Sequence, residues 1–278
     1  MNPDTSLHFA VIGDPIAHSK SPLMHNAAFR ALGMNADYTA VHVTKDALPG
    51  FLERARTELN GFNVTVPHKN AVIPFLDGVS DRAKLAGSVN TVSVREGRLY
   101  GDTTDGTGLE RALLEVFGMP LDGAKVCILG CGGVVRALVY HLADAGCARL
   151  RILNRTADKA AKLVDEIRAH APTLDCGSAA LDDTDGVREA LEGSGVVLQC
   201  TSLGLHDGDG SPIDPGLIPA HVCVFDTIYR ETAILAGCRT RGMKVSGGLP
   251  MLVHQGAESF RIWTGREAPV EVMRHAAE

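Results

Sequence analysis

The stretch from Lys125 to Thr156 constrains the fold most, because it places a buried strand, a glycine turn and a helix in one run. Val126 to Leu129 form a short apolar run typical of a parallel strand covered on both faces. Apolar residues then recur at helical spacing, and a second apolar strand ends at Leu153. This pattern predicts a dinucleotide-binding βαβ unit of about 30 residues.

The turn after the first strand is where we expect the pyrophosphate to bind. Glycine lets the backbone approach the phosphates, and the free N–H groups of the helix N-terminus favour an anion. The turn residues are Gly130, Cys131, Gly132, Gly133 and Val134. The third glycine of the usual fingerprint is replaced by Val135, so we expect the helix to stand slightly further from the strand.

The tip of the second strand indicates which dinucleotide binds. An NAD site usually has an acidic residue here to bind the ribose 2′-hydroxyl. This chain instead has Asn154, Arg155 and Thr156, followed by Lys159. A guanidinium can pair with a 2′-phosphate and stack on adenine. The segment therefore predicts NADP as the cofactor, with NAD still possible; the alternative is that Arg155 is an ordinary surface residue.

Composition excludes several classes of function. The 278 residues carry a net charge of −6, which gives no electrostatic footprint for nucleic acid or an anionic membrane. The seven cysteines are scattered and form no C-x-x-C pair, so neither a disulfide framework nor a metal site is predicted. There is no leader pattern, and no apolar run approaches the ~18 residues of a membrane span. We expect a cytoplasmic protein with a small-molecule substrate; monomer and homodimer stay open.

A serine-rich loop near the N-terminus is a candidate carboxylate site. Ser19 and Ser21 flank a lysine just before Pro22, which opens a helix pattern. Two hydroxyls beside a helix start could bind a carboxylate. The alternative is that Ser21 only caps the helix as its N-cap residue.

Three further segments carry polar residues typical of a site for a polyol. The stretch from Gly61 to Lys69 reads as a strand whose Asn63 and Thr65 share a face, with Lys69 at its carboxyl end, where ligands gather in α/β sheets. Asn90 begins a hairpin strand, and Asp105 precedes a helix expected from Leu109 to Phe117. Asn63 and Thr65 could instead form a core network, and Asp105 could simply complement a helix dipole.

Taken together, these motifs resemble those of the shikimate dehydrogenase family over essentially the whole chain. The loop His18–Pro22 is similar to the family's HSxSP motif, and Asn63–Lys69 resembles its NVTxPxK motif. The resemblance implies Lys69 and Asp105 as the catalytic pair. It implies substrate contacts from Ser19, Ser21, Asn63, Thr65, Asn90, Tyr229 and Gln255. It implies cofactor contacts from Asp81, Thr201 and Gly248, besides the glycine turn, Asn154–Thr156 and Lys159.

The resemblance also implies the reaction and the architecture. The reaction would be reversible hydride transfer between NADPH and the carbonyl of 3-dehydroshikimate, with Lys69 stabilising the developing alkoxide. The fold would be α/β with two domains. Residues 1–104, completed by 249–278, would form the substrate-binding domain, and residues 105–248 a Rossmann-type NADP-binding domain. Which of Lys69 and Asp105 is the formal acid or base stays open.

Three other functions compete with this interpretation. A quinate/shikimate dehydrogenase could use NAD or both cofactors; Ser21 favours shikimate, because some quinate-preferring relatives carry Thr there. An enzyme similar to glutamyl-tRNA reductase would share the glycine turn, but residues 1–126 contain no cysteine to act as its nucleophile. A metabolite sensor without catalysis would not need both Lys69 and Asp105.

Overall fold

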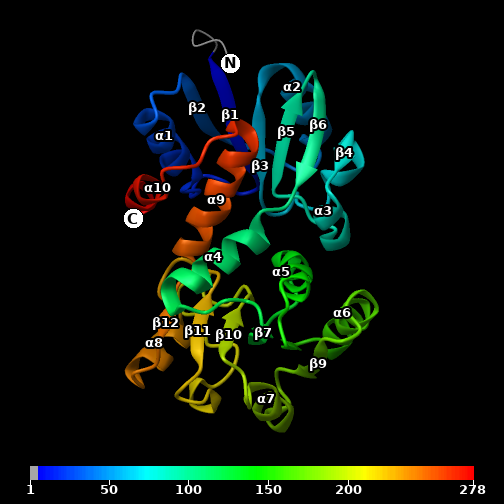
Figure 1. Cartoon of the computed structure of the whole chain (residues 1–278), viewed down its shortest axis with the longest axis vertical. Coiled ribbons are helices and arrows are strands. Elements are labelled where there is room, and N and C mark those ends of the chain that lie inside the picture. Colours follow the sequence, from blue (N-terminus) through cyan, green and yellow to red (C-terminus); the bar gives the residue numbers. More distant parts are fainter. Residues whose placement is uncertain (1–5) are drawn as a thin grey trace. The chain divides into compact units, whose positions relative to one another are not determined.

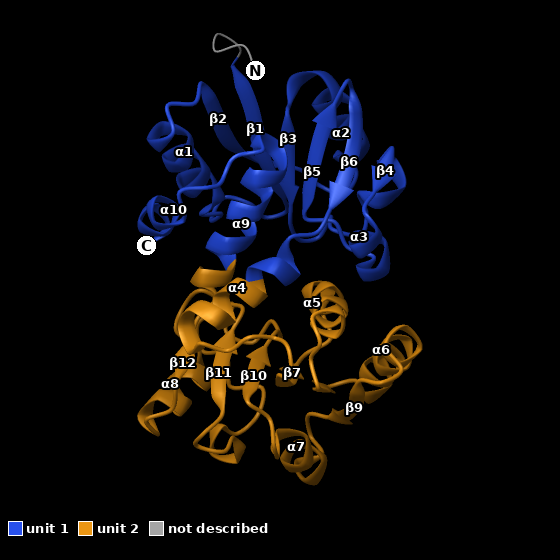
Figure 2. Cartoon of the chain, in the orientation of Figure 1, with its two compact units in different colours: residues 1–108, 252–278 blue, residues 109–251 orange. Residues whose placement is uncertain are grey.

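The computed structural model describes residues 6–278, which form two compact units (Figure 2). Unit 1 comprises the described residues through Gly108 together with Leu252–Glu278, and unit 2 comprises Leu109–Met251. The unit boundaries fall within helices α4 (Asp105–Phe117) and α9 (Leu249–Thr264). The expected domain boundaries at residues 104 and 249 stay a prediction.

Unit 1 is built on a mixed six-stranded sheet in the order β2-β1-β3-β5-β6-β4 (Figure 1). The first three of these are parallel, β5 is antiparallel to β3 and β6, and β4 is parallel to β6. Its strands are β1 (Leu7–Gly13), β2 (Ala36–His42), β3 (Gly61–Val64), β4 (Gly78–Val79), β5 (Thr91–Arg95) and β6 (Arg98–Asp102). Its other helices are α1 (Ser21–Ala31), α2 (Leu48–Glu58), η1 (Ile73–Phe75), α3 (Asp81–Ala86) and α10 (Val270–Ala277).

Unit 2 is a doubly wound parallel sheet in the order β12-β11-β10-β7-β8-β9. In this order β7 and β10 are neighbours although they are not consecutive in the chain, which is the topological switch point of a Rossmann fold. The strands are β7 (Lys125–Leu129), β8 (Arg149–Asn154), β9 (Asp175–Ala180), β10 (Val196–Gln199), β11 (Cys223–Asp226) and β12 (Val245–Ser246). The helices are α5 (Gly133–Asp144), α6 (Ala157–His170), α7 (Thr184–Leu191), η2 (Pro215–Leu217) and α8 (Ala233–Thr240). The expected α/β class and Rossmann-type domain are confirmed.

The glycine turn needs its first glycine because two strand ends meet there. Gly130 has φ +108°, and a Cβ at this position would lie 3.0 Å from the Cys200 backbone at the end of β10. Val135, at the third fingerprint position, is fully buried in the core beneath α5. The chain therefore accommodates the larger side chain of Val135 by burying it in the hydrophobic core of unit 2.

The C-terminal helices return to unit 1, as expected. Helix α10 packs on α1, and Trp263 of α9 donates its indole N–H to the Val92 carbonyl of β5 at 3.0 Å. Trp263 also stacks on Phe9 of β1 with ring centroids 5.0 Å apart. Helix α9 is thereby fixed against the sheet, which sets the position of every side chain that it points at the site.

Two expected elements differ from the structure near the site. The strand expected over residues 61–69 ends at Val64, because the chain then turns and the His68 N–H donates to the Thr65 carbonyl. The helix expected from Leu109 begins at Asp105 instead, so Asp105 belongs to its first turn. Gly106 and Gly108 are thus helical rather than loop residues, because the Gly108 N–H bonds to the Thr104 carbonyl at 2.9 Å.

None of the helices within residues 6–278 is long and apolar enough to cross a membrane.

Gly61→Ala tests the packing of α9 on the sheet. A Cβ at Gly61 would lie 2.5 Å from the Trp263 indole nitrogen and 2.9 Å from the Val92 carbonyl oxygen, so the indole or the β5 backbone must move and their hydrogen bond is disturbed. We expect the free energy of unfolding to fall by about 1–3 kcal/mol. Urea unfolding followed by the fluorescence of the single tryptophan measures it.

Gly50→Ala in α2 is the matched control, because the nearest side-chain atom is 3.9 Å from its new Cβ. It should leave the stability unchanged or raise it by up to about 1 kcal/mol. Equal effects of the two substitutions would contradict the packing argument.

Candidate active site

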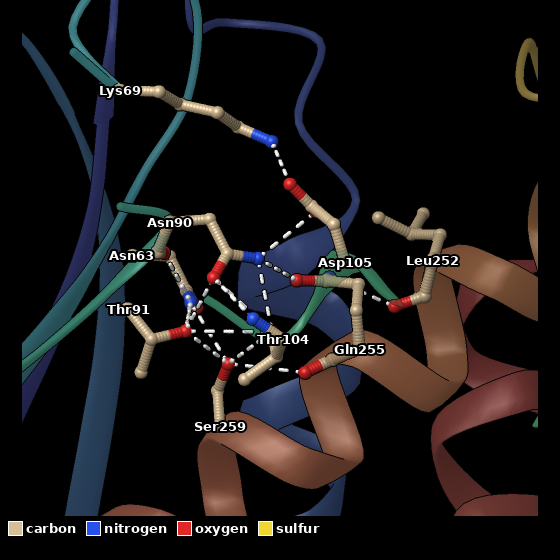
Figure 3. Close-up of polar contacts among 9 residues, drawn as sticks. All are labelled: Asn63, Lys69, Asn90, Thr91, Thr104, Asp105, Leu252, Gln255 and Ser259. Carbon is tan, nitrogen blue, oxygen red and sulfur yellow. Dashed lines mark hydrogen bonds and ion pairs between the residues drawn. The ribbon is translucent and has the colours of Figure 1, made fainter. Parts of the chain in front are cut away.

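A buried ion pair lies at the centre of the polar network in unit 1. Lys69 Nζ donates to Asp105 Oδ2 at 2.6 Å, with the two side chains only 16% and 5% exposed (Figure 3). The Lys69 carbonyl accepts the Val89 N–H at 2.8 Å, which fixes the backbone from which the lysine extends. The structure therefore brings together the lysine and the aspartate that the sequence placed 36 residues apart.

Asn90 holds the other oxygen of the aspartate. Its amide nitrogen donates to Asp105 Oδ1 at 3.0 Å and also contacts Gln255 Oε1 at 3.2 Å. Its amide oxygen accepts the backbone N–H of Thr104 at 2.8 Å and the hydroxyl of Thr91 at 3.0 Å. The Asn90 amide can take only one orientation, since its donors face acceptors and its acceptor faces donors.

Asn63 is held by a second set of contacts behind Asn90. Its amide nitrogen donates to the Asn90 carbonyl at 2.9 Å and to Ser259 Oγ at 3.0 Å. Its amide oxygen accepts the Tyr38 hydroxyl at 2.6 Å. Burial raises the pKa of Tyr38, so the phenol keeps the proton that it donates. Asn63 is only 6% exposed, and Tyr38 occupies one of the two lone pairs of its amide oxygen.

No role was predicted from the sequence for four members of this network: Tyr38, Thr91, Thr104 and Ser259. Ser259 Oγ lies 2.8 Å from Thr91 Oγ1 and 3.3 Å from Thr104 Oγ1 (Figure 3). The two threonines directly follow or precede residues that the sequence did single out. Ser259 lies one helical turn after Gln255 on α9, and that spacing is the signal that could have found it.

The serine loop differs from the expected capping arrangement. Helix α1 begins at Ser21, and Lys20 is the N-cap residue with helical dihedral angles. The hydroxyl of Ser19 accepts the Ser21 N–H at 3.3 Å, and Ser21 interacts with the Tyr38 hydroxyl. Ser21 is therefore not the N-cap, and its hydroxyl is not used for capping.

Two residues expected in unit 1 lie outside this hydrogen-bonded network. The backbone N–H of Thr65 donates to the Ile12 carbonyl at 2.9 Å, and its side chain is half-buried. Asp81 is almost fully exposed at the start of α3, where it pairs with Lys84 at 3.2 Å.

In unit 2, the glycine turn presents an accessible backbone. Gly132 and Gly133 are exposed at the N-terminus of α5, whereas Gly130 is buried and Val134 is half-buried. Cys131 Sγ contacts the Lys159 carbonyl at 3.6 Å, so the turn lies against the start of α6. Open N–H groups at a helix start are the donors that a pyrophosphate requires.

The tip of β8 carries free positive charge beside this turn. Arg155 and Lys159 are exposed, and within residues 6–278 the Arg155 guanidinium has no hydrogen-bond or ion-pair partner. Asn154 donates its amide to the Thr156 carbonyl at 2.9 Å, which shapes the loop between them. The segment can therefore offer a guanidinium to a phosphate.

Three remaining candidates lie at the carboxyl edge of the same sheet. Thr201 follows β10, Tyr229 follows β11 and is 46% exposed, and Gly248 is buried directly before α9. The described residues hold no cluster of three or more metal-ligating side chains.

A Rossmann-type unit in one chain with a buried lysine–aspartate pair is the arrangement of a dinucleotide-dependent dehydrogenase. Three family models match the chain: the shikimate dehydrogenase substrate binding domain over residues 11–92, shikimate/quinate 5-dehydrogenase over 112–204, and the shikimate 5′-dehydrogenase C-terminal domain over 248–278. The chain belongs to the shikimate/quinate dehydrogenase family.

Similar proteins match over nearly the whole length. The shikimate dehydrogenase (NADP(+)) of Symbiobacterium thermophilum is 44% identical, over 96% of this chain and 92% of its own. The shikimate 5-dehydrogenase of Thermus thermophilus, solved with NADP(H) and shikimate, has a TM-score of 0.86 and 38% identity, with 98% of each chain covered. The quinate dehydrogenase of Corynebacterium glutamicum, solved with NAD, has a TM-score of 0.84 and 29% identity, also with 98% of each covered.

Proposed function

We propose that this chain is an NADP-dependent dehydrogenase that interconverts 3-dehydroshikimate and shikimate. The observation that carries the proposal is the buried Lys69–Asp105 pair, held by Asn90 in a unit whose polar groups suit a polyol. The family membership and the 44% identity to a shikimate dehydrogenase (NADP(+)) support it.

The residues of unit 2 fit NADP as the cofactor. The exposed turn at Gly132 and Gly133 would hold the pyrophosphate, and the free guanidinium of Arg155, with Lys159 nearby, would hold the 2′-phosphate. We also assign contacts with the cofactor to Gly130, Cys131, Val134, Asn154, Thr156, Thr201, Gly248 and Asp81. When bound, the nicotinamide gives or accepts the hydride.

Lys69, Asp105 and Asn90 would stabilise the negative charge on the reacting oxygen and supply its proton. Reduction of a carbonyl develops negative charge on its oxygen, and the Lys69 ammonium can stabilise that charge and pass a proton. Asp105 anchors the ammonium through Oδ2, while Asn90 anchors Asp105 through Oδ1. The lysine is thus aimed before substrate arrives, which lowers the cost of reorganisation in the transition state.

The other polar groups of unit 1 would bind the substrate. Ser19 and Ser21 would bind the carboxylate, because the Ser21 hydroxyl is not spent on a helix cap. Tyr229, which belongs to unit 2, is also assigned as a substrate contact. Asn63, Thr65, Asn90 and Gln255 would bind the ring hydroxyls. We further propose that the protein acts in the cytoplasm as a monomer or homodimer.

A single assay separates this function from its alternatives. The purified protein is given shikimate or quinate, each with NADP⁺ or NAD⁺, and formation of reduced cofactor is followed by its absorbance. We expect the highest kcat/KM for shikimate with NADP⁺. A preference for quinate or NAD⁺ would make it a quinate/shikimate-type enzyme, and no turnover with any pair would indicate a sensor.

Labelling of Cys131 tests the position of the cofactor. Six of the seven cysteines are buried and Cys131 is only half-buried, so one thiol should react fast with a thiol reagent. We expect saturating NADP⁺ to slow this phase and Cys131→Ala to abolish it. A fast phase that NADP⁺ does not affect would place the cofactor away from the turn.

Lys69→Ala tests the proposed chemistry. Removal of a positioned proton-transfer group should lower kcat by about 10²–10⁴-fold. The KM for NADP⁺ should hardly change, because the cofactor residues of unit 2 are untouched. Steady-state kinetics beside the exposed-lysine control Lys45→Ala measure both. More than about a tenth of the wild-type kcat in Lys69→Ala would remove Lys69 from the chemistry.

Arg155→Ala tests the choice of cofactor. A charge-assisted guanidinium–phosphate contact contributes about 1.5–3 kcal/mol, so the KM for NADP⁺ should rise roughly 10- to 150-fold. The KM for NAD⁺ should change only a few-fold, because NAD⁺ has no phosphate there. Arg188→Ala, which removes another exposed arginine of unit 2, is the control. Equal losses for both cofactors would mean that Arg155 only supports the loop.

A further inference from the structure

Two fully buried polar residues lie side by side at the carboxyl edge of the unit 2 sheet. Gln199 ends β10 and Asp226 ends β11, and the two are direct partners in the parallel register. Both have an exposed fraction of 0%, and the nearby Gln199 side chain acts to lower the pKa of Asp226. Asp226 begins a D-x-x-Y segment that ends at Tyr229, but no role was predicted from the sequence for Asp226 or Gln199.

The Gln199 side chain folds onto the loop that follows its own strand. Its amide oxygen accepts the Thr201 N–H at 2.7 Å, and its amide nitrogen donates to the Leu203 carbonyl at 2.9 Å. The backbone of the loop that begins at Thr201 is therefore tied to a side chain inside the sheet.

The Asp226 side chain does the same for the next loop. Oδ1 accepts the Ile228 N–H at 2.9 Å, and Oδ2 accepts the Thr232 hydroxyl at 2.7 Å. These two bonds span the segment that carries Tyr229, the proposed substrate contact.

The two loops are also tied to each other and to the start of α9. The Thr227 N–H and hydroxyl both donate to the Gln199 carbonyl at 3.0 Å. The Gly248 N–H donates to the Ile228 carbonyl at 3.0 Å, and a Cβ at Gly248 would collide with the Thr227 carbonyl. A shift at either anchor would move all three segments.

We propose that Gln199 and Asp226 are positioning residues that set the loops carrying Thr201, Tyr229 and Gly248 for cofactor and substrate. The inference rests on the proposed function, because it gives those three residues their ligands. Neither Gln199 nor Asp226 would touch a ligand, since both are fully buried.

The buried carboxylate of Asp226 is costly to stability. Within residues 6–278 no cation pairs with it, and the titratable group that faces it is the buried thiol of Cys200. Burial raises the pKa of Asp226 from 3.8 to about 6, although Ile228 and Thr232 donate to it and the nearby Gln199 side chain also acts to lower this pKa. The folded protein binds the proton more tightly than the unfolded chain, so stability falls as the pH rises through this range and stays lowered above it.

Substitutions at Asp226 separate anchoring from mere packing. Asp226→Ala removes both loop bonds and should raise the KM for shikimate and for NADP⁺ about tenfold or more. Asp226→Asn keeps an acceptor for Ile228 and lets the Thr232 hydroxyl turn to accept, so both KM values should stay within about threefold of wild type. The same variant should melt at a higher temperature than wild type at a pH above about 7 and at the same temperature near pH ~4.

Asp183→Ala is the matched control, because Asp183 also accepts a backbone N–H in unit 2 but is exposed at the start of α7. Its KM values should not change. Thr232→Val, which preserves shape and removes one donor to Asp226, should raise the KM for shikimate about 2- to 10-fold. It provides the kinetic test if Asp226→Ala does not fold.

Wild-type KM values in Asp226→Ala, or in Thr232→Val where the alanine variant does not fold, would overturn the inference. So would an Asp226→Asn variant as impaired as Asp226→Ala. A wild-type protein that turns over no shikimate with NADP⁺ would instead overturn the proposed function, so the two failures are distinguishable.

Discussion

The candidate site of unit 1 depends on one side-chain amide, that of Asn90. It connects the strand β5, the first turn of α4 and the helix α9, because its partners are Thr104, Asp105 and Gln255. If the amide were flipped, its NH₂ group would face the Thr104 N–H, and its oxygen would face the Asp105 carboxylate. Both contacts would be repulsive. The aspartate is thereby held in one orientation, and Lys69 is held by the aspartate.

Local patterns in the sequence were sufficient for the first βαβ unit of unit 2, because such a unit is built from contacts between neighbours in the chain. The pairing of β7 with β10 joins segments that are not consecutive. The strand at Lys125–Leu129, the turn at Gly130 and the tip at Asn154 were all visible as periodicity and glycine spacing. Helix ends near the site were less predictable. The helix was expected only from Leu109, so Asp105 was placed before it, whereas the helix begins at Asp105 and includes Gly106 and Gly108.

The network around the Lys69–Asp105 ion pair was only partly predictable, for a physical reason. Lys69, Asp105 and Asn90 are residue types that chemistry needs, so their motifs are conspicuous. Gln199 and Asp226 bind the loops that follow their own strands, and their sequence neighbours do not reveal that both side chains are fully buried. Ser259 acts through contacts made only after distant segments pack. Ser259 meets Thr91 across 168 residues, and nothing local distinguishes it from an ordinary helix serine. The sequence also did not reveal that the Ser21 hydroxyl makes no helix cap. That follows from the structure, in which Lys20 is the N-cap residue and has helical dihedral angles.

Two buried aspartates, Asp105 and Asp226, differ in how their charge is compensated. Asp105 has an ammonium 2.6 Å away, so its ionised form is matched within the site. Asp226 has only dipolar donors, and its burial raises its pKa towards neutrality. A neutral side chain could fill the same space without the cost of a buried charge. What a neutral apolar residue could not do is accept from Ile228 and Thr232 together. In unit 2, the buried Asp226 therefore lowers stability at the position that holds two loops. In unit 1, the buried charges of Lys69 and Asp105 are paired, at the position where the proposed reaction would need them.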